Sequence, residues 1–297
     1  MKVIVCIKQV PDINVWIEVD PFTNSIDTED MVYIVNPSDV VAVEAALAIK
    51  EATGNGEVIL ISLGPERVRK ALRKCMAMGA ADEAIHLRVS ASDHLDVFKT
   101  SQALAKAIDS LEYDMILCGD RAKDMELSGG QVGPMIAEML GLPHVSEIDQ
   151  MEISPDRKKA VVHRKLERGN REVVECLLPT LFSVAPGLNS PRYPSFSSSL
   201  KAIRSEIRKI GLESLGLESG DWGDRSAVTE LLKISTPKPR QKRIFTPESH
   251  LSASERINLI MAGGIAEKKG DFIEGSPGEM AEQVVEFLVK ENIIDKK

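Results

Sequence analysis

Aromatic residues, cysteines and positive charge are all scarce in this chain of 297 residues. Aromatic residues make up 4% of the chain, and the net charge is -8 at pH 7. A nucleic-acid-binding protein needs a basic surface and often stacks bases on aromatic side chains, so we do not expect that function. The four cysteines contain no CxxC pair and the five histidines show no ligand spacing, so we do not expect a metal site either.

Long apolar runs are missing as well. No stretch approaches the roughly 20 apolar residues that a membrane span requires. The apolar run at the N-terminus ends at Lys8, which makes it too short for the core of a signal peptide. We therefore expect a globular protein of the cytoplasm, or of an organelle lumen if a transit peptide was removed.

The familiar motifs of hydrolytic and dinucleotide chemistry are also missing. The chain contains no GxSxG, HExxH, GxxxxGK[ST] or GxGxxG pattern, and no acidic residue is marked as a general acid or base. Binding or electron transfer is favoured over hydrolysis, because electron transfer leaves the demanding chemistry to a cofactor.

Strand-like and helix-like segments alternate over about the first 143 residues. The expected buried strands are 2–8, 57–63, 84–87 and 113–118. The expected helices begin near Asn36 and after Pro65, and span 94–110 and 131–140. Alternation with short links is typical of a parallel sheet covered by helices on both faces. The pattern predicts an α/β, Rossmann-like domain of three layers, with its ligand beyond the carboxyl ends of the strands.

The pattern changes after about residue 150. Two strand-like runs flank residues 168–170, which predicts a hairpin, and residues 181–184 predict a further strand. Beyond Pro186 the chain is irregular and rich in Ser, Pro, Gly and charged residues up to about residue 250. We expect an α/β domain at residues 1–186, and an extended arm with a C-terminal helix at residues 187–297 that lies on a partner.

A glycine-rich loop from Gly119 to Gly133 follows a strand and enters a helix. Glycine lets the backbone approach an anion closely, and the N–H groups of a helix start attract phosphate. The residues placed to wrap an anion are Ser128, Gly129, Gly130 and Gln131. A second helix start lies at Asn36, Pro37 and Ser38 on the same expected edge. Alone, the loop equally fits a tight turn and the helix start a plain cap, but together they favour a nucleotide site.

Six segments in matching order resemble the beta subunit of electron transfer flavoproteins. They are residues 2–12, 35–39, 63–65 with 77–80, 130–134, 173–179 and 188–193. The resemblance covers residues 1 to about 205. The last segment, Leu188 to Tyr193, is similar to the family's signature region, with Ser190 where Glu is usual. The glycine-rich loop from Gly119 to Gly133, which corresponds to the family's phosphate loop, is longer than the family's usual pattern.

The resemblance implies a domain of the adenine nucleotide-binding type and a C-terminal arm that wraps the alpha subunit. It implies AMP in this subunit for ordinary members, and a second FAD in the same place for electron-bifurcating members. It also implies that the redox-active FAD sits mainly on the alpha subunit. By position, the residues that would line the nucleotide site are Cys6, Asn36, Pro37, Ser38, Asp39, Leu63, Gly119, Asp120, Arg121, Ser128, Gly129, Gly130, Gln131 and Val132.

One short stretch bears on the choice between FAD and AMP. Bifurcating members tend to carry an Asp-Thr-x-Ala-Thr-Ser stretch at a helix in this part of the chain. Asp96, Thr100 and Ser101 fit that pattern, whereas Val97 and Lys99 do not. Asp96 and Thr100 therefore join the expected site. The stretch slightly favours FAD, and with it electron bifurcation from NADH.

The resemblance also implies a docking loop for a partner dehydrogenase, of the acyl-CoA or another type. The family docks through a leucine whose matching position here is Phe196, and an aromatic anchor suits such docking. Packing of Phe196 on the alpha subunit or within the arm is an equal alternative. The other residues expected to contact partners are Asn189, Pro191, Arg192 and Tyr193.

Two other functions stay open. One is a stand-alone ATP- or AMP-binding protein of the same broad fold without a redox function. Ser128-Gly129-Gly130 faintly resembles the phosphate loop of ATP pyrophosphatases, although that loop normally follows the first strand. The other is a scaffold with an empty site, because the phosphate loop is altered. We favour an electron carrier that acts as an oxidoreductase only within a complex.

Overall fold

The computed structural model describes most of the first 217 residues and two later helices. The described residues are 1–15, 19–20, 25–26, 31–79, 82–89, 96–122, 130–217, 247, 251–261 and 275–290. The chain divides into two compact units, Met1–Thr236 and Pro237–Lys297, and each is described by itself.

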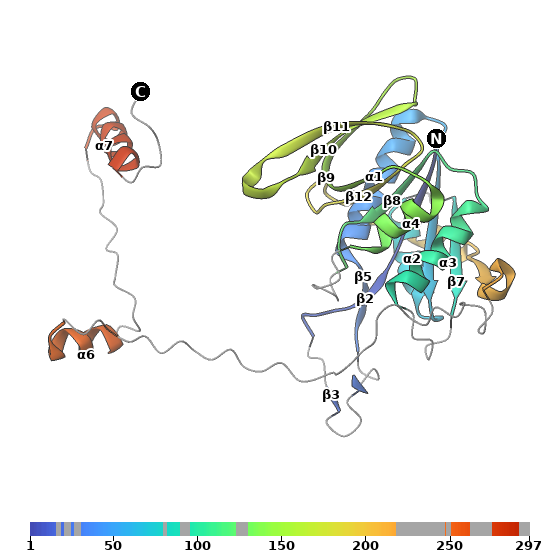
Figure 1. Cartoon of the computed structure of the whole chain (residues 1–297), viewed down its shortest axis with the longest axis horizontal. Coiled ribbons are helices and arrows are strands. Elements are labelled where there is room, and N and C mark those ends of the chain that lie inside the picture. Colours follow the sequence, from blue (N-terminus) through green and yellow to red (C-terminus); the bar gives the residue numbers. More distant parts are fainter. Residues whose placement is uncertain are drawn as a thin grey trace. The chain divides into compact units, whose positions relative to one another are not determined.

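A sheet of nine strands forms the centre of the first unit (Figure 1). Its order is β11-β10-β9-β12-β8-β1-β6-β7-β13. The strands are β1 (Lys2–Cys6), β6 (Glu57–Gly64), β7 (Glu83–Arg88), β8 (Met115–Gly119), β9 (His144–Ile153), β10 (Lys159–Lys165), β11 (Arg171–Leu177), β12 (Thr180–Val184) and β13 (Arg208–Gly211). The seven neighbouring strands β9-β12-β8-β1-β6-β7-β13 pair in parallel. At one end of the sheet, β10 pairs antiparallel with both β9 and β11. The predicted parallel sheet and the hairpin of β10 and β11 are confirmed.

Two small antiparallel pairs lie within the long connection after β1. The first joins β2 (Gln9–Pro11) to β5 (Tyr33–Val35), and the second joins β3 (Val19–Asp20) to β4 (Ser25–Ile26). The first pair extends the chain beyond the end of β1 and then returns it to the sheet, where a helix begins. This connection therefore occupies the carboxyl edge of the sheet.

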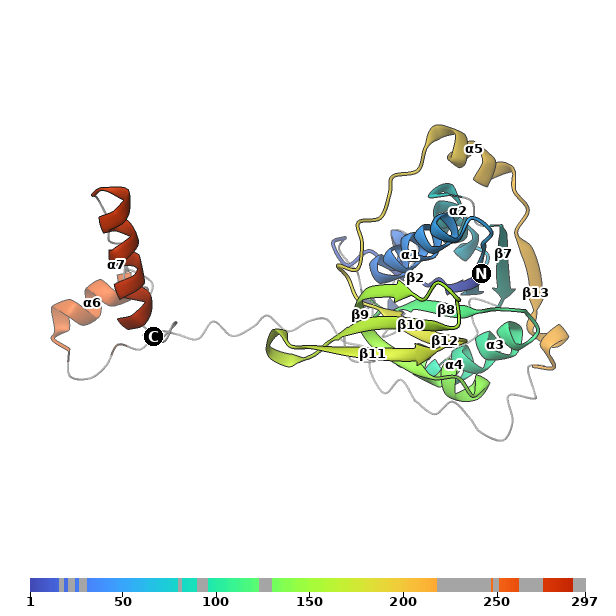
Figure 2. The ribbon, with the colours of Figure 1, turned by 90° about the horizontal axis from the view of Figure 1, so that it is seen from above.

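Helices cover both faces of the sheet, as Figure 2 shows from above. On one face lie α1 (Pro37–Thr53) and α2 (Val68–Ala77), and on the other lie α3 (Val97–Asp109) and α4 (Val132–Leu140). Side chains alternate between the faces along a strand. In β1, Val3 and Val5 therefore join the core under α1 and α2, whereas Ile4 joins the core under α3 and α4. The three-layer α/β fold is confirmed.

The strand order reverses at β1, which fixes where a ligand can enter. From β1 the chain passes through α1 to β6 on one side, and from β7 through α3 to β8 on the other. The loops that leave β1 and β8 must therefore part at the carboxyl edge. In open α/β sheets the crevice at such a reversal is the usual ligand site.

The segment after Pro186 contains regular elements that the sequence did not predict. A short helix, α5 (Phe196–Arg204), packs against α2, and Arg73 donates hydrogen bonds to the carbonyls of Ala202 and Ile203 at its end. Strand β13 then pairs with β7 at the sheet edge. Both elements were overlooked because α5 is serine-rich and β13 has only four residues, two of them charged. Short 3-10 turns, η1 (Glu167–Gly169) and η2 (Leu212–Leu215), complete this part.

The described part of the second unit consists of α6 (Ala253–Met261) and α7 (Pro277–Lys290). Each begins with a capping box: Glu255 accepts from the backbone of Ser252 at 2.9 Å, and Glu279 does so from Ser276 at 2.9 Å. Both helices expose large apolar side chains. They are Ile257, Ile260, Val284, Val285 and Phe287. None of the described helices is long and apolar enough to cross a membrane.

Phe182 offers a test of the core. Its side chain is fully buried in β12, so Phe182→Ala is expected to lower the free energy of unfolding by about 3–5 kcal/mol. Val173 on β11 is 62% exposed, and Val173→Ala should change that free energy by less than about 0.5 kcal/mol. Denaturant titration measures both variants. Equal losses in the two would contradict the placement of the core.

Candidate nucleotide site

One buried carboxylate, that of Asp39, joins the two loops that part at the reversal. Asp39 lies in the first turn of α1 and accepts hydrogen bonds from the backbone N–H of Lys8 at 2.6 Å and of Gly119 at 3.0 Å. The side chain of Asn36 donates to Asp39 Oδ1 and to the carbonyl of Arg121, both at 2.9 Å. The Asp39 side chain therefore links three segments by hydrogen bonds: the end of β1, the start of α1 and the end of β8.

Two glycines let the backbone come close at this point. A Cβ on Gly119 would overlap Asp39 Oδ1 and would lie 2.7 Å from the Cβ of Ser38. Gly130, with φ at +70°, packs so closely on the carbonyl oxygen of Asp120 that a Cβ there would overlap it. Both positions therefore require glycine, and the loop after β8 lies directly against the N-terminus of α1.

Burial disfavours negative charge at the same edge. Burial raises the pKa of Asp39 to about 7, although hydrogen bonds from Lys8, Asn36 and Gly119 act in the opposite direction. Burial also raises the pKa of Asp120, whose Oδ1 has no hydrogen-bond partner in the described part of the chain. A carboxyl group that gives up its charge readily repels a phosphate group less, so both residues are compatible with an anionic ligand nearby.

The side chain of Arg121 forms an ion pair with a neighbouring strand. Its Nη2 lies 2.6 Å from Oε1 of Glu147 on β9, and Glu147 raises the pKa of Arg121. Glu147 itself has φ at +55°, a backbone conformation that costs a residue with a side chain some strain. The guanidinium is well exposed, so the pair holds the loop weakly and leaves Arg121 able to reach a ligand.

The cysteines at this edge are packing residues. Burial raises the pKa of Cys6, and it raises the pKa of Cys118 to about 12. The Cys118 Sγ lies 3.4 Å from Oγ of Ser183, which in turn lies 2.8 Å from Nε2 of His144. Because a thiol reacts as its thiolate, raised pKa values make both cysteines poor nucleophiles. All four cysteines of the chain are buried free thiols.

The structure places the other predicted residues of the site along the same edge. Leu63 lies near the end of β6, on the far side of β1 from β8. Asp96 caps α3 and accepts a hydrogen bond from the backbone of Lys99 at 2.8 Å, and Thr100 lies one turn further on. The residues at the two helix starts are Pro37 and Ser38 of α1 and Gln131 and Val132 of α4. Ser128 and Gly129 lie outside the described residues.

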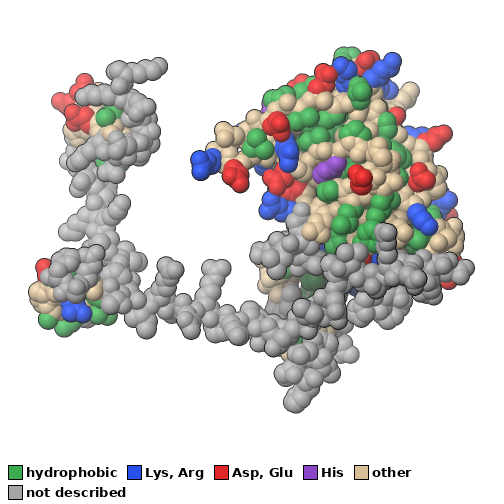
Figure 3. Space-filling view, in the orientation of Figure 1, with side chains coloured by type: hydrophobic (Ala, Val, Ile, Leu, Met, Phe, Trp, Pro, Cys, Tyr) green, Lys and Arg blue, Asp and Glu red, His purple; other side chains and the backbone are tan. Residues whose placement is uncertain are grey.

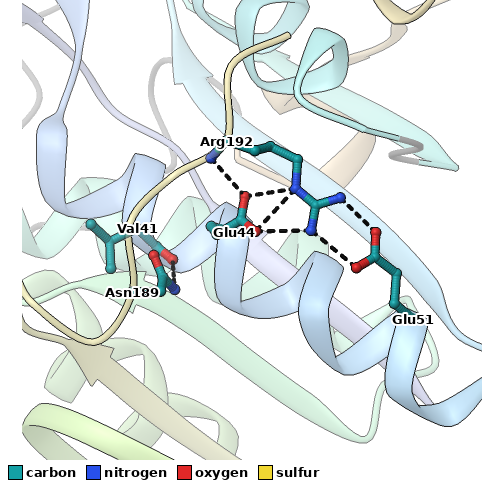
Figure 4. Close-up of polar contacts among 5 residues, drawn as sticks. All are labelled: Val41, Glu44, Glu51, Asn189 and Arg192. Carbon is teal, nitrogen blue, oxygen red and sulfur yellow. Dashed lines mark hydrogen bonds and ion pairs between the residues drawn. The ribbon is translucent and has the colours of Figure 1, made fainter. Parts of the chain in front are cut away.

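The segment from Leu188 to Tyr193 is strapped across α1, as Figure 4 shows. Arg192 donates from Nε and Nη2 to Glu44, at 2.8–3.0 Å, and from Nη1 and Nη2 to Glu51, at 2.5 and 3.0 Å. Its backbone N–H donates to Glu44 as well, and Asn189 Nδ2 donates to the carbonyl of Val41 at 3.0 Å. These two residues hold the segment in place within this chain.

Of the remaining predicted docking residues, Tyr193 and Phe196 are exposed and Pro191 is partly buried. Tyr193, the last residue of the strap, is 97% exposed, and Phe196, three residues later, is 86% exposed. Pro191 lies within the strap itself. On the face drawn in Figure 3, Lys and Arg side chains are interspersed with Asp and Glu side chains, and apolar patches lie between them. Such a mixed surface suits a protein partner.

Sequence reasoning overlooked the acidic partners of the two arginines. Glu44 and Glu51 are seven residues apart on α1, so they lie on one face of the helix two turns apart. That spacing was a usable signal for a bidentate basic partner. The sequence gives no comparable signal for Glu147. Strand β9 is not among the predicted strands, and the tertiary fold sets the backbone conformation of Glu147.

A model of the family described as "Electron transfer flavoprotein domain" matches residues 23–213. The chain belongs to the electron transfer flavoprotein family. The match includes the strap, α1, and both helix starts of the candidate site. The resemblance found in the motifs is thereby confirmed.

Three relatives illustrate the range of the family. The chain is 38% identical over 263 residues to the electron transfer flavoprotein subunit beta of Thermoanaerobacterium thermosaccharolyticum, which covers 87% of this chain and 98% of the relative. It is 37% identical over 238 residues to the caffeyl-CoA reductase-Etf complex subunit CarD of Acetobacterium woodii, over 80% and 88% of the two chains. It is 34% identical over 265 residues to protein FixA of Azotobacter vinelandii, over 86% and 92%. The chain therefore belongs with the family's beta subunits, which favours electron transfer over stand-alone nucleotide binding.

The raised pKa of Asp39 predicts a dependence of stability on pH. An unfolded aspartate titrates near pH 4, at about 3.9, so between about pH 4 and 7 the folded state binds more protons than the unfolded state. The stability that this group contributes is present below about pH 4 and is lost as the pH rises through about 7. The unfolding free energy of the wild-type chain should therefore fall across this range relative to that of Asp39→Asn. Urea titrations at several pH values measure the difference, and a constant difference would contradict the assignment.

Removal of the Arg192 clamp should loosen the strap. Arg192→Ala leaves Glu44, which is buried, without its bidentate partner, so the free energy of unfolding should fall by about 1–3 kcal/mol. Chymotrypsin should also cleave faster after Phe196. The matched control is Arg208→Ala, which removes only an exposed pair with Glu83 and should leave the cleavage rate unchanged. Identical digestion of both variants would show that the clamp does not order the strap.

Proposed function

We propose that the carboxyl edge around Asp39 holds one adenine nucleotide, FAD or AMP, in a heterodimer with an electron transfer flavoprotein alpha subunit that carries the redox-active FAD. The support is the close approach of Gly119 to α1 and of Gly130 to Asp120, which leaves backbone rather than side chains at the edge. The starts of α1 and α4 add N–H groups that have no partner within their own helices. A bound flavin would supply electron carriage, and this chain's residues bind and orient it.

We favour FAD over AMP in this subunit. The support is Asp96 and Thr100 at the start of α3, which fit the stretch typical of bifurcating members. A relative whose name places it in a caffeyl-CoA reductase-Etf complex is 37% identical to the chain. The first observation supports an electron-bifurcating complex that takes electrons from NADH, and the second supports membership of a larger complex with a reductase.

The partner contacts follow the same division of the chain. In this proposal residues 1–186 form the nucleotide-binding domain, to which α5 and β13 add a further helix and an edge strand. The rest of residues 187–297 form an arm on the alpha subunit, to which α6 and α7 turn their exposed apolar side chains. Tyr193 and Phe196 dock on a dehydrogenase, because both are exposed aromatic side chains beside an ordered strap. A cytoplasmic location stays a prediction, as does a partner dehydrogenase of the acyl-CoA or another type.

A count of the nucleotides released from the purified heterodimer tests the proposal. Two FAD and no AMP per heterodimer support FAD in this subunit, whereas one of each supports AMP. In Gly119→Ala the new Cβ would meet Asp39 and Ser38, so the nucleotide of this subunit should fall by at least about tenfold in occupancy while the FAD of the alpha subunit stays.

Gly211→Ala is the matched control. A Cβ at Gly211 meets nothing within 4 Å, so that variant should keep both nucleotides. Full nucleotide content in Gly119→Ala, with the fold intact by circular dichroism, would place the nucleotide elsewhere. A wild-type heterodimer with one FAD and no second nucleotide would favour the scaffold with an empty site.

A further inference from the structure

The first turn of α4 lies against strands β8 and β12 at a glycine. A Cβ on Gly133 would lie 2.8 Å from Sγ of Cys118 and 2.8 Å from Oγ of Ser183, closer than such atoms pack in proteins. Cys118 belongs to β8 and Ser183 to β12. The backbone of Gly133 therefore rests directly on these two side chains, and their positions set how closely the start of the helix approaches the sheet.

Gly133 is also one of the few residues in this turn with an N–H group to offer. A helix leaves the N–H groups of its first turn without partners within the helix itself. Pro134 has no N–H, and Met135 already donates to the carbonyl of Gln131 at 3.2 Å. Of the first three helical residues, only Val132 and Gly133 therefore have an N–H to donate to an anion.

A chain of polar contacts holds Ser183 in place under the helix. Its Oγ lies 2.8 Å from Nε2 of His144 and 3.4 Å from Sγ of Cys118. A serine hydroxyl donates one hydrogen and accepts others, so the two neighbours together fix the side chain of Ser183. Burial lowers the pKa of His144, and Arg164 acts in the same direction, so the ring is neutral at pH 7.

The position of His144 connects this support to the other end of α4. The helix ends at Leu140, and His144 is the first residue of β9 after a short connection. The C-terminal end of α4 is thus joined to His144, whereas its first turn rests on Ser183. The hydrogen bond between His144 and Ser183 therefore ties both ends of the helix to strand β12.

We propose that Ser183 and His144 are positioning residues for the nucleotide of this subunit: they hold Gly133 where its N–H can donate to a phosphate oxygen. This inference rests on the proposed function, and it assigns no contact with the nucleotide to either side chain. A hydrogen bond weakens steeply once donor and acceptor are misaligned, so even a small shift of the helix start should lower the affinity.

Gly133→Ala tests the support from the side of the helix. The new methyl group meets Cys118 and Ser183 and pushes the first turn away from the sheet, so the affinity for the nucleotide should fall at least about tenfold. Adding Cys118→Ala and Ser183→Ala removes both obstructing atoms, and the next atom, Cδ2 of Leu181, lies at an ordinary 3.4 Å. This triple variant should recover at least about threefold of the lost affinity, because its methyl group occupies the space left by the two atoms.

His144→Leu tests the support from the side of the sheet. The variant keeps an apolar side chain but loses the hydrogen bond to Ser183, so the affinity should fall by about three- to tenfold. His144→Gln keeps a polar nitrogen that can bond to Ser183 and should stay within about twofold of the wild type. His163→Leu is the matched control, because it changes a partly buried histidine of β10 and should leave the affinity within about twofold.

Calorimetric titration of AMP and of FAD into heterodimer stripped of this subunit's nucleotide measures the affinity. Urea unfolding of each chain separates positioning from packing. Phe182→Ala lowers stability from the other face of β12, yet the folded heterodimer should keep its affinity within about twofold. Affinities that follow stability across all of these variants would overturn the inference. So would full affinity in Gly133→Ala or His144→Leu, or a triple variant as weak as Gly133→Ala.

The two proposals fail in different ways. A wild-type heterodimer that binds neither AMP nor FAD in this subunit counts against the proposed function. Tight binding by the wild type, together with unchanged affinity in Gly133→Ala and His144→Leu, counts against the positioning residues alone.

Discussion

The structure depends on the burial of one carboxylate between two loops that the sheet topology drives apart. The strand order reverses beside β1, so the chain leaves β1 and β8 in different directions. Asp39 bridges them through the backbone of Lys8 and Gly119, and Asn36 supports it. The two loops must separate to leave a crevice at the carboxyl edge, and they must also keep a fixed position if a ligand is to bind there. The hydrogen bonds of Asp39 fix the positions of both loops.

Helix α1 transmits that constraint to the rest of the domain. Its N-terminus is fixed by Asp39, its middle turns contact the strap through Glu44 and Glu51, and Ala48 lines a groove beside β9. The loops of the proposed nucleotide site, the strap and the region beside β9 are thus all positioned by one rigid element. A single helix of 17 residues can contact all three because its faces point in different directions.

Much of the fold could be predicted from sequence because local patterns and tertiary structure agree there. The apolar runs of β1, β6 and β8, and the Asn-Pro start of α1, indicated the parallel core and its carboxyl edge. Other features depend on distant residues and leave little local trace. Strand β13 forms where β7 offers an open edge, and Glu147 takes its positive φ from its place in β9.

The hydrogen bonds of Arg192 to Glu44 and Glu51 depend on the helical register of α1, that is, on which side of the helix these two residues face. Insertion of one residue between Asp39 and Glu44 would rotate the rest of α1 by about 100° relative to its fastened N-terminus. Glu44 and Glu51 would then face away from the strap, and Ala48 away from β9. Substitutions on the outer face of α1 are therefore easier for this chain to accommodate than any change in its length, so length variation among related chains should fall in the connections after β1 and β8 and not within this helix.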